Sequence, residues 1–174
     1  MNARSIACLL ALTTGASLLA CGPADSAQAD PAPANEFGPP DVEIPDPCAL
    51  LTFAEVEQYL GRAPLSTETP DVGTHARMCT WMTPSQARPI IGLHVTTGAM
   101  KDWDAFVEYM VEGEWGDPRT EGQRVDVGRF GYLTAEELQV HTEQGWLLDF
   151  GQIRGAGASE GVLELARLAV GRLP

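Results

Sequence analysis

Four cysteines and three histidines are the residues of this 174-residue chain whose chemistry depends most on their surroundings. Cys21 follows an apolar run that begins at Ile6, after Arg4, and ends with the small residue Ala20. This run is shorter than the roughly 20 residues that a membrane-spanning helix needs. A charged start, an apolar middle and a small-residue exit predict a cleaved export signal over residues 1–20. A cysteine directly after the exit predicts a lipoprotein, acylated at Cys21.

The lipid on Cys21 predicts where the chain is found. Diacylglycerol on the thiol and an acyl chain, such as palmitate, on the freed amine supply two or more hydrophobic chains, which anchor stably where one holds only marginally. We therefore expect a protein tethered to the cell membrane or cell envelope, outside the cytoplasm. The alternative is ordinary secretion with cleavage after Ala29, which ends a second small-x-small sequence.

Cys48 and Cys79 are the cysteines that remain beyond the signal and the anchor. In an exported protein an isolated pair most simply forms a disulfide. The alternative is a metal site that also uses His75, four residues before Cys79, but no CxxC or second histidine completes a ligand set. We expect the bond and no metal.

One set of polar residues falls on the same face of the predicted sheet. If Leu93 and Val95 face the core, the residue between them points to the opposite face, and the same alternation applies in the later strands. The residues placed there are His94, Gln139, His141 and Asp149. They form a candidate ligand-binding face, and the alternative is a solvated sheet face with no function. Tyr109, Trp115 and Trp146 are candidate ligand platforms or, alternatively, core and rim packing.

Sequence motifs for catalysis are missing from the chain. It contains no Gly-x-Ser-x-Gly, His-Glu-x-x-His, Walker loop or dinucleotide fingerprint. We therefore expect no enzyme and no cofactor. The net charge of −13, with Lys101 as the single lysine, excludes the basic surface that nucleic acid requires.

Composition divides the mature chain into a linker and one domain. Residues 22–47 hold seven of the 13 prolines, six acidic residues and no Lys or Arg, so residues 21–47 are expected to be a lipidated spacer. Residues 48–174 have the length of one small domain. Apolar periodicity there predicts helices over 53–60, 101–114 and 159–172, strands over 76–83 and 90–97, and three or four short strands between 124 and 153.

These elements predict an α+β fold. We expect a two-layer sandwich with a mostly antiparallel sheet of about five strands, about three helices largely on one face, and one disulfide. One hairpin can be placed in register, because Leu138, Val140, Leu148 and Phe150 must all face the core. A three-residue loop ending at Gly145 pairs Val140 with Leu148, and it places glycine where the turn needs a left-handed residue.

Two motifs carry a resemblance to a known family. Asp46-Pro47-Cys48-Ala49-Leu50-Leu51-Thr52 and Cys79-Thr80-Trp81 resemble the Pro-Cys-x-Leu-Leu-Thr and Cys-x-Trp motifs of a large family of uncharacterised, mainly actinobacterial secreted lipoproteins. A later segment, Gly128–Leu133, matches the family's pattern imperfectly. The resemblance implies a Cys48–Cys79 bridge and a compact α+β fold, and it brings no catalytic residues. A more distant analogue, the extracellular sensor domain of a mycobacterial receptor kinase, implies ligand sensing by fold analogy alone.

Together these observations predict a tethered, non-catalytic binding or sensing module. Its partner beyond the membrane is expected to be a cell-envelope protein, a wall component or a small ligand. The alternative is an enzyme with an unrecognised site around His94, His141 and Asp149, which a deep pocket containing all three would favour.

Overall fold

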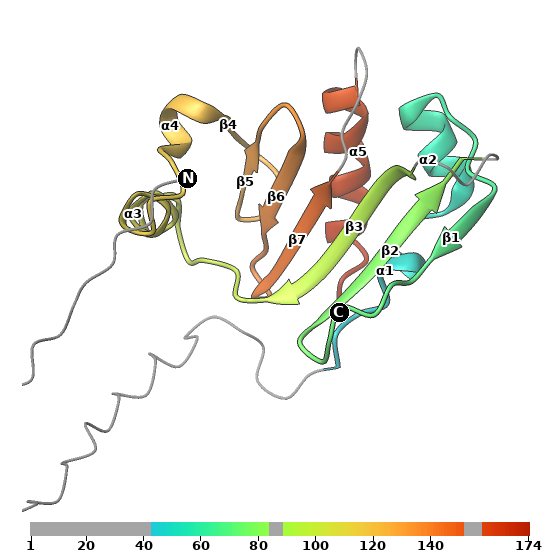
Figure 1. Ribbon diagram of the computed structural model, residues 1–174, viewed down its shortest axis with the longest axis horizontal. Coiled ribbons are helices and arrows are strands. Elements are labelled where there is room, and N and C mark those ends of the chain that lie inside the picture. Colours follow the sequence, from blue (N-terminus) through green and yellow to red (C-terminus); the bar gives the residue numbers. More distant parts are fainter. Residues whose placement is uncertain (1–42, 84–88, 152–157) are drawn as a thin grey trace, which may run out of the picture. The chain divides into compact units, whose positions relative to one another are not determined.

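A computed structural model of the protein describes residues 43–83, 89–151 and 158–174 (Figure 1). Within these residues one antiparallel sheet of seven strands runs in the order β1-β2-β3-β7-β6-β5-β4. The strands are β1 (Ser66–Glu68), β2 (Ala76–Met82), β3 (Pro89–Thr97), β4 (Gln123–Val125), β5 (Phe130–Leu133), β6 (Glu137–His141) and β7 (Trp146–Gly151). The expected signal, Cys21 and the linker up to residue 42 lie outside the described residues.

Five helices accompany the sheet in the described ranges. They are α1 (Pro47–Leu50), α2 (Phe53–Leu60), α3 (Trp103–Glu112), α4 (Pro118–Glu121) and α5 (Ala158–Val170). The helix starts follow from their caps, since Thr52 and Glu55 form a capping box and the Asp102 side chain accepts a hydrogen bond from the Ala105 N–H. The two short helices share an Asp-Pro start, with the aspartate as N-cap and the proline at the first helical position.

The inner face of the sheet packs against α1, α2 and α5 and forms the main core. Alternate strand residues supply it from the four central strands: Cys79, Trp81, Ile91, Leu93, Val95, Leu138, Val140, Leu148 and Phe150. Helices α2 and α5 approach closely at Gly161, which has no side chain. A Cβ atom added there would lie 2.1 Å from the Tyr59 carbonyl oxygen. Helix α5 contributes Leu165 and Ala166, both fully buried.

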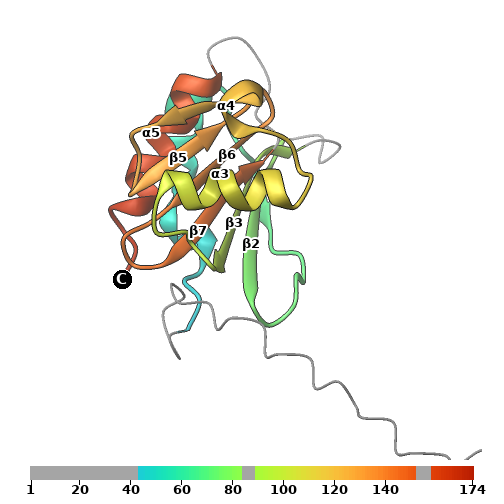
Figure 2. The ribbon, with the colours of Figure 1, turned by 90° about the vertical axis from the view of Figure 1, so that its left-hand side faces the viewer.

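The outer face of the sheet is covered at one end by α3. Phe106 of α3 packs with Phe130 and Tyr132 of β5 in a second, smaller cluster. These two β5 residues pair with His141 and Gln139, which places the cluster on the face opposite the main core. Figure 2 shows α3 crossing this end of the sheet, away from α2 and α5.

The expected α+β class and antiparallel sheet are confirmed, but the expected counts are wrong. In the described residues the sheet has seven strands rather than about five, and there are five helices rather than about three. The elements outside the expected ranges are short: β1 has three residues at a sheet edge, and α1 and α4 have four each. Strand β4, also of three residues, is one of four strands in the stretch where three or four were expected. The expectation that the helices pack largely on one face fails for α3, because its apolar stripe is buried against β5 on the outer face.

The predicted β6–β7 hairpin register is confirmed. Val140 pairs with Leu148 and Leu138 with Phe150. Gly145 adopts φ +89°, the left-handed region that the loop requires. The buried Thr142 hydroxyl accepts a hydrogen bond from the Trp146 N–H at 2.9 Å, so the loop is held by a side chain as well as by its backbone.

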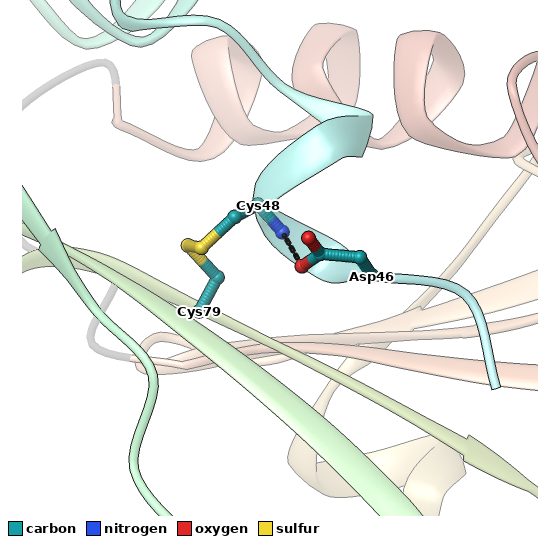
Figure 3. Close-up of a disulfide and its surroundings, with 3 residues drawn as sticks. All are labelled: Asp46, Cys48 and Cys79. Atoms are coloured by element: carbon teal, nitrogen blue, oxygen red, sulfur yellow. Dashed lines mark hydrogen bonds between the residues drawn. A yellow bond between two sulfur atoms is a disulfide. The ribbon is translucent and has the colours of Figure 1, made fainter.

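The predicted disulfide is also confirmed. Cys48 of α1 and Cys79 of β2 are bonded, with their Cα atoms 5.2 Å apart (Figure 3). Asp46 accepts a hydrogen bond from the Cys48 N–H at 2.9 Å and so caps the helix that carries the bond. With both sulfurs in the bond, the alternative metal site with His75 has no thiolate ligand.

Candidate binding pocket on the outer face

A pocket of about 490 Å³ lies between α3 and the outer face of the sheet. Strands β6 and β7 supply its floor, from Glu137, Gln139, His141 and Leu147. Its walls and rim come from Met100, Phe106, Tyr109, Met110 and Trp115. A mostly apolar cavity of this size with a few polar groups is typical of small-molecule sites.

His141 is the most deeply buried polar residue of this pocket. Its ring stacks on Phe130 with centroids 4.4 Å apart and lies 5.2 Å from the Phe106 ring. Its Nδ1 accepts a hydrogen bond from the Met100 N–H at 2.8 Å. Burial, with a smaller effect of the Arg129 charge, lowers the pKa of His141 to about 4. The imidazole is therefore neutral at pH 7, and its remaining proton is on Nε2.

For His141, the alternative of a solvated sheet face is wrong. The residue does point to the outer face, as strand alternation predicts, yet it is only 2% exposed. The cause is α3, which places Phe106 over it. Its Nε2 is buried and has no hydrogen-bond partner in the part of the chain that the structure describes.

The other three candidate residues form one row across neighbouring strands. His94 of β3 pairs with Asp149 of β7, which pairs with Gln139 of β6. Gln139 lines the pocket, whereas His94 and Asp149 lie on the same face outside it. The structure therefore brings all four candidates to one face but only Gln139 and His141 into one cavity.

Burial shifts the pKa values of both residues outside the pocket. Burial, with a smaller contribution from the Glu137 charge, raises the pKa of Asp149 to about 6. Burial alone lowers the pKa of His94. Among the described residues, His94 Nε2 and Asp149 Oδ1 have no hydrogen-bond partner. This part of the face thus holds polar groups that water or a ligand would stabilise.

Two aromatic residues form the exposed rim of the pocket. Tyr109 is 54% exposed and Trp115 is 68% exposed, whereas Trp146 is core. The turn after α3 positions Trp115: Glu114 adopts φ +58°, and the Trp115 N–H donates to the Met110 carbonyl at 2.9 Å. A Cβ atom at Gly113 would lie 2.3 Å from the indole ring, so a larger residue there would displace the Trp115 side chain.

Sequence reasoning missed the pocket residues that only the position of α3 brings together. Phe106 and Met110 belong to an apolar stripe that any core helix would carry, and Met100 lies three residues before the first residue of α3. Glu137 had a usable signal, because it precedes Gln139 by two residues and must share its face. Leu147 had the same kind of signal, because it precedes Asp149 by two residues in β7 and must share its face.

Two other kinds of feature are absent from the described residues. They contain no group of three or more His, Cys, Asp or Glu side chains arranged to hold a metal ion. None of their helices is both long enough and apolar enough to cross a membrane.

Comparisons of the chain with protein-family models, curated proteins and solved structures find no match. The resemblance to the lipoprotein family thus depends on the two cysteine motifs and stays a prediction.

Proposed function

We propose that the protein is a non-catalytic binding or sensing module, tethered outside the cytoplasm by lipid on Cys21, that holds a small ligand beneath α3. The observation that carries this proposal is the 490 Å³ pocket with an exposed aromatic rim and a buried polar floor. Exposed aromatic side chains beside a cavity supply contact area at low entropic cost. The volume fits a small organic molecule rather than a folded partner.

The candidate that competes with a binding module is an enzyme. Its support is that His94, His141 and Asp149 all have shifted pKa values, and perturbed groups cluster at functional sites. Only His141 of the three lines the pocket, however. With Nδ1 accepting the Met100 N–H and the proton on Nε2, this histidine has no free lone pair to act as a base. We therefore prefer binding to catalysis.

The tether is tested by Cys21→Ser. We expect this substitution to abolish metabolic labelling with lipid and to leave unprocessed precursor or released protein. The measurement is membrane fractionation together with lipid labelling. A Cys21→Ser protein that is processed normally and still sediments with the membrane would rule the anchor out.

The pocket is tested by adding a panel of small aromatic and aliphatic compounds to the purified protein and detecting binding by NMR. We expect binders whose affinity falls several-fold in Trp115→Ala. Phe53→Ala is the matched control, because Phe53 is a 42% exposed aromatic residue of α2, outside the pocket. Equal losses in both variants, or no binder at all, would contradict the proposed site.

A further inference from the structure

The pocket floor changes in chemical character along β6. Glu137, Gln139 and His141 alternate on one strand and all line the pocket. At a rise of about 3.3 Å per residue, the Cα atoms of Glu137 and His141 are about 13 Å apart. One end of the floor therefore carries a carboxylate, and the other end carries an uncharged imidazole.

The carboxylate end has a negative potential that reaches both neighbouring strands. Burial and then the charge of Glu137 raise the pKa of Asp149 on β7. Burial, the Glu121 charge and then the Glu137 charge raise the pKa of Tyr132 on β5. In the described ranges Glu137 makes no ion pair, and no Lys or Arg lines the pocket. The closest polar contact of the carboxylate is the Gln139 amide, which donates at 3.4 Å. A half-buried carboxylate without a counter-ion favours a cation.

The rest of the pocket suits an organic cation rather than a metal ion. Tyr109 and Trp115 stand at the rim with exposed rings, and the faces of such rings attract ammonium groups. Phe106, Met110 and Leu147 supply an apolar surface for the body of a ligand. His141 does not oppose a cation, because its imidazole is neutral at pH 7.

We propose that the ligand of this pocket is an organic monocation, with an ammonium group at Glu137 beside the aromatic rim and an apolar body against Phe106 and Leu147. This inference rests on the proposed binding function and adds the chemical class of the ligand. An anionic ligand is disfavoured at the same site, because it would meet Glu137 without a compensating positive charge from the lining residues.

Three probes of equal size and different head charge test this inference. They are 3-phenylpropylamine, 3-phenylpropan-1-ol and 3-phenylpropanoate, titrated into the purified protein at pH 7. We expect the ammonium compound to bind about tenfold more tightly than the alcohol, and the carboxylate to bind most weakly. The affinity of the ammonium compound should fall as salt is raised, while that of the alcohol should not.

Glu137→Gln is the decisive variant, and Glu136→Gln is its matched control. Glu136 is exposed, adjacent in sequence and outside the pocket lining. We expect Glu137→Gln to reduce the preference for ammonium over alcohol to less than about twofold, and Glu136→Gln to preserve it. The salt dependence of the unsubstituted protein provides the same information if Glu137→Gln does not fold.

The outcomes separate this inference from the function on which it rests. If the alcohol binds as tightly as the amine, with an affinity that depends on Trp115, the pocket function stands and the cationic ligand class is overturned. If Glu137→Gln leaves a preference for the amine intact, the assignment of the ammonium group to Glu137 is wrong. If none of the three probes binds, both proposals fail.

Discussion

The two faces of the sheet differ in what covers them. The inner face lies under α1, α2 and α5, is closed by the Cys48–Cys79 bond and presents an almost unbroken set of buried apolar side chains. The outer face is covered at one end by α3 and holds three of the buried polar atoms that lack a partner in the described chain, on His94, His141 and Asp149.

This difference suggests that the inner face stabilises the fold and that the outer face binds the ligand. Apolar burial on the inner face is the main favourable contribution to folding. Unpartnered polar atoms on the outer face cost stability, and such costs are tolerated where a ligand or water later satisfies them. The inner face therefore acts as the scaffold, and the outer face is where we expect sequence changes to alter function without unfolding the protein.

The largest expected effect contrasts two consecutive leucines of β7. Leu148 is fully buried on the inner face, whereas Leu147 is half-buried on the outer face. We expect Leu148→Ala to lower the free energy of unfolding by about 2–5 kcal/mol and Leu147→Ala by less than about 1.5 kcal/mol. Urea denaturation of both variants measures the contrast. Similar losses would mean that the outer face contributes to the core as much as the inner face does.

The disulfide should give the next largest effect. It encloses a sequence separation of 31 residues, for which chain entropy predicts a stabilisation of about 3.5 kcal/mol. We expect the Cys48→Ala/Cys79→Ala double variant to fold at low temperature and to lose roughly 2–5 kcal/mol in chemical denaturation. Unfolding the unsubstituted protein with a reductant present should reproduce this loss. An unchanged stability in both experiments would contradict a structural role for the bond.

Asp149 and His141 on the outer face should have opposite effects on the stability of the protein as pH changes. The folded-state pKa of Asp149, about 6, lies above its ordinary 3.8, so stability from this group falls as pH rises from about 4 to 6. The folded-state pKa of His141, about 4, lies below its ordinary 6.5, so stability from this group rises between about 4 and 6.5. Each effect is at most about 3 kcal/mol, and the two largely cancel in the unsubstituted protein.

Two variants should reveal how the free energy of unfolding depends on pH for each group separately. We expect Asp149→Asn to show stability rising from pH 4 to 6.5, and to gain stability over the unsubstituted protein as pH increases. His141→Gln should show the opposite slope, a decline between pH 4 and 6. Denaturation as a function of pH provides the measurement, and the slope rather than the absolute stability is the readout. Parallel curves for all three proteins would refute the burial of both groups.

The smallest expected effect on stability is at the aromatic rim. Tyr109 and Trp115 are more than half exposed, so Tyr109→Ala and Trp115→Ala should change the free energy of unfolding by less than about 0.5 kcal/mol. Thermal melts of the two variants check this expectation. A larger loss would mean that the rim supports the fold, and a weaker affinity in these variants could not then be assigned to lost ligand contacts.

Sequence patterns predict the short elements less well than the long ones. Strands β1 and β4 have three residues each, too few for an alternating pattern to be recognised. The Asp117-Pro118 pair follows the end of α3 and also begins α4. Asp46-Pro47 begins α1 in the same way. The Asp-Pro signal for a helix start was present in both places, and without a following apolar stripe it did not predict a helix.

Residue types and their spacing were enough to predict the local and pairwise features: the α+β class, the capping box of Thr52 and Glu55, the hairpin register and the Cys48–Cys79 pair. Each depends on residue types at fixed spacing, because a strand alternates with period two and a capping box joins residues three positions apart. The face on which each of His94, Gln139, His141 and Asp149 would lie followed from the same alternation.

Which polar residues share a cavity depends on the tertiary structure and could not be predicted from the sequence. Helix α3 has an apolar stripe that fits either face of a sheet, and its docking against β5 depends on contacts between residues far apart in the chain. That docking buries His141, leaves Asp149 and His94 outside the pocket and places Trp115 at the rim. Periodicity describes one element at a time, whereas a pocket is a property of the space between elements.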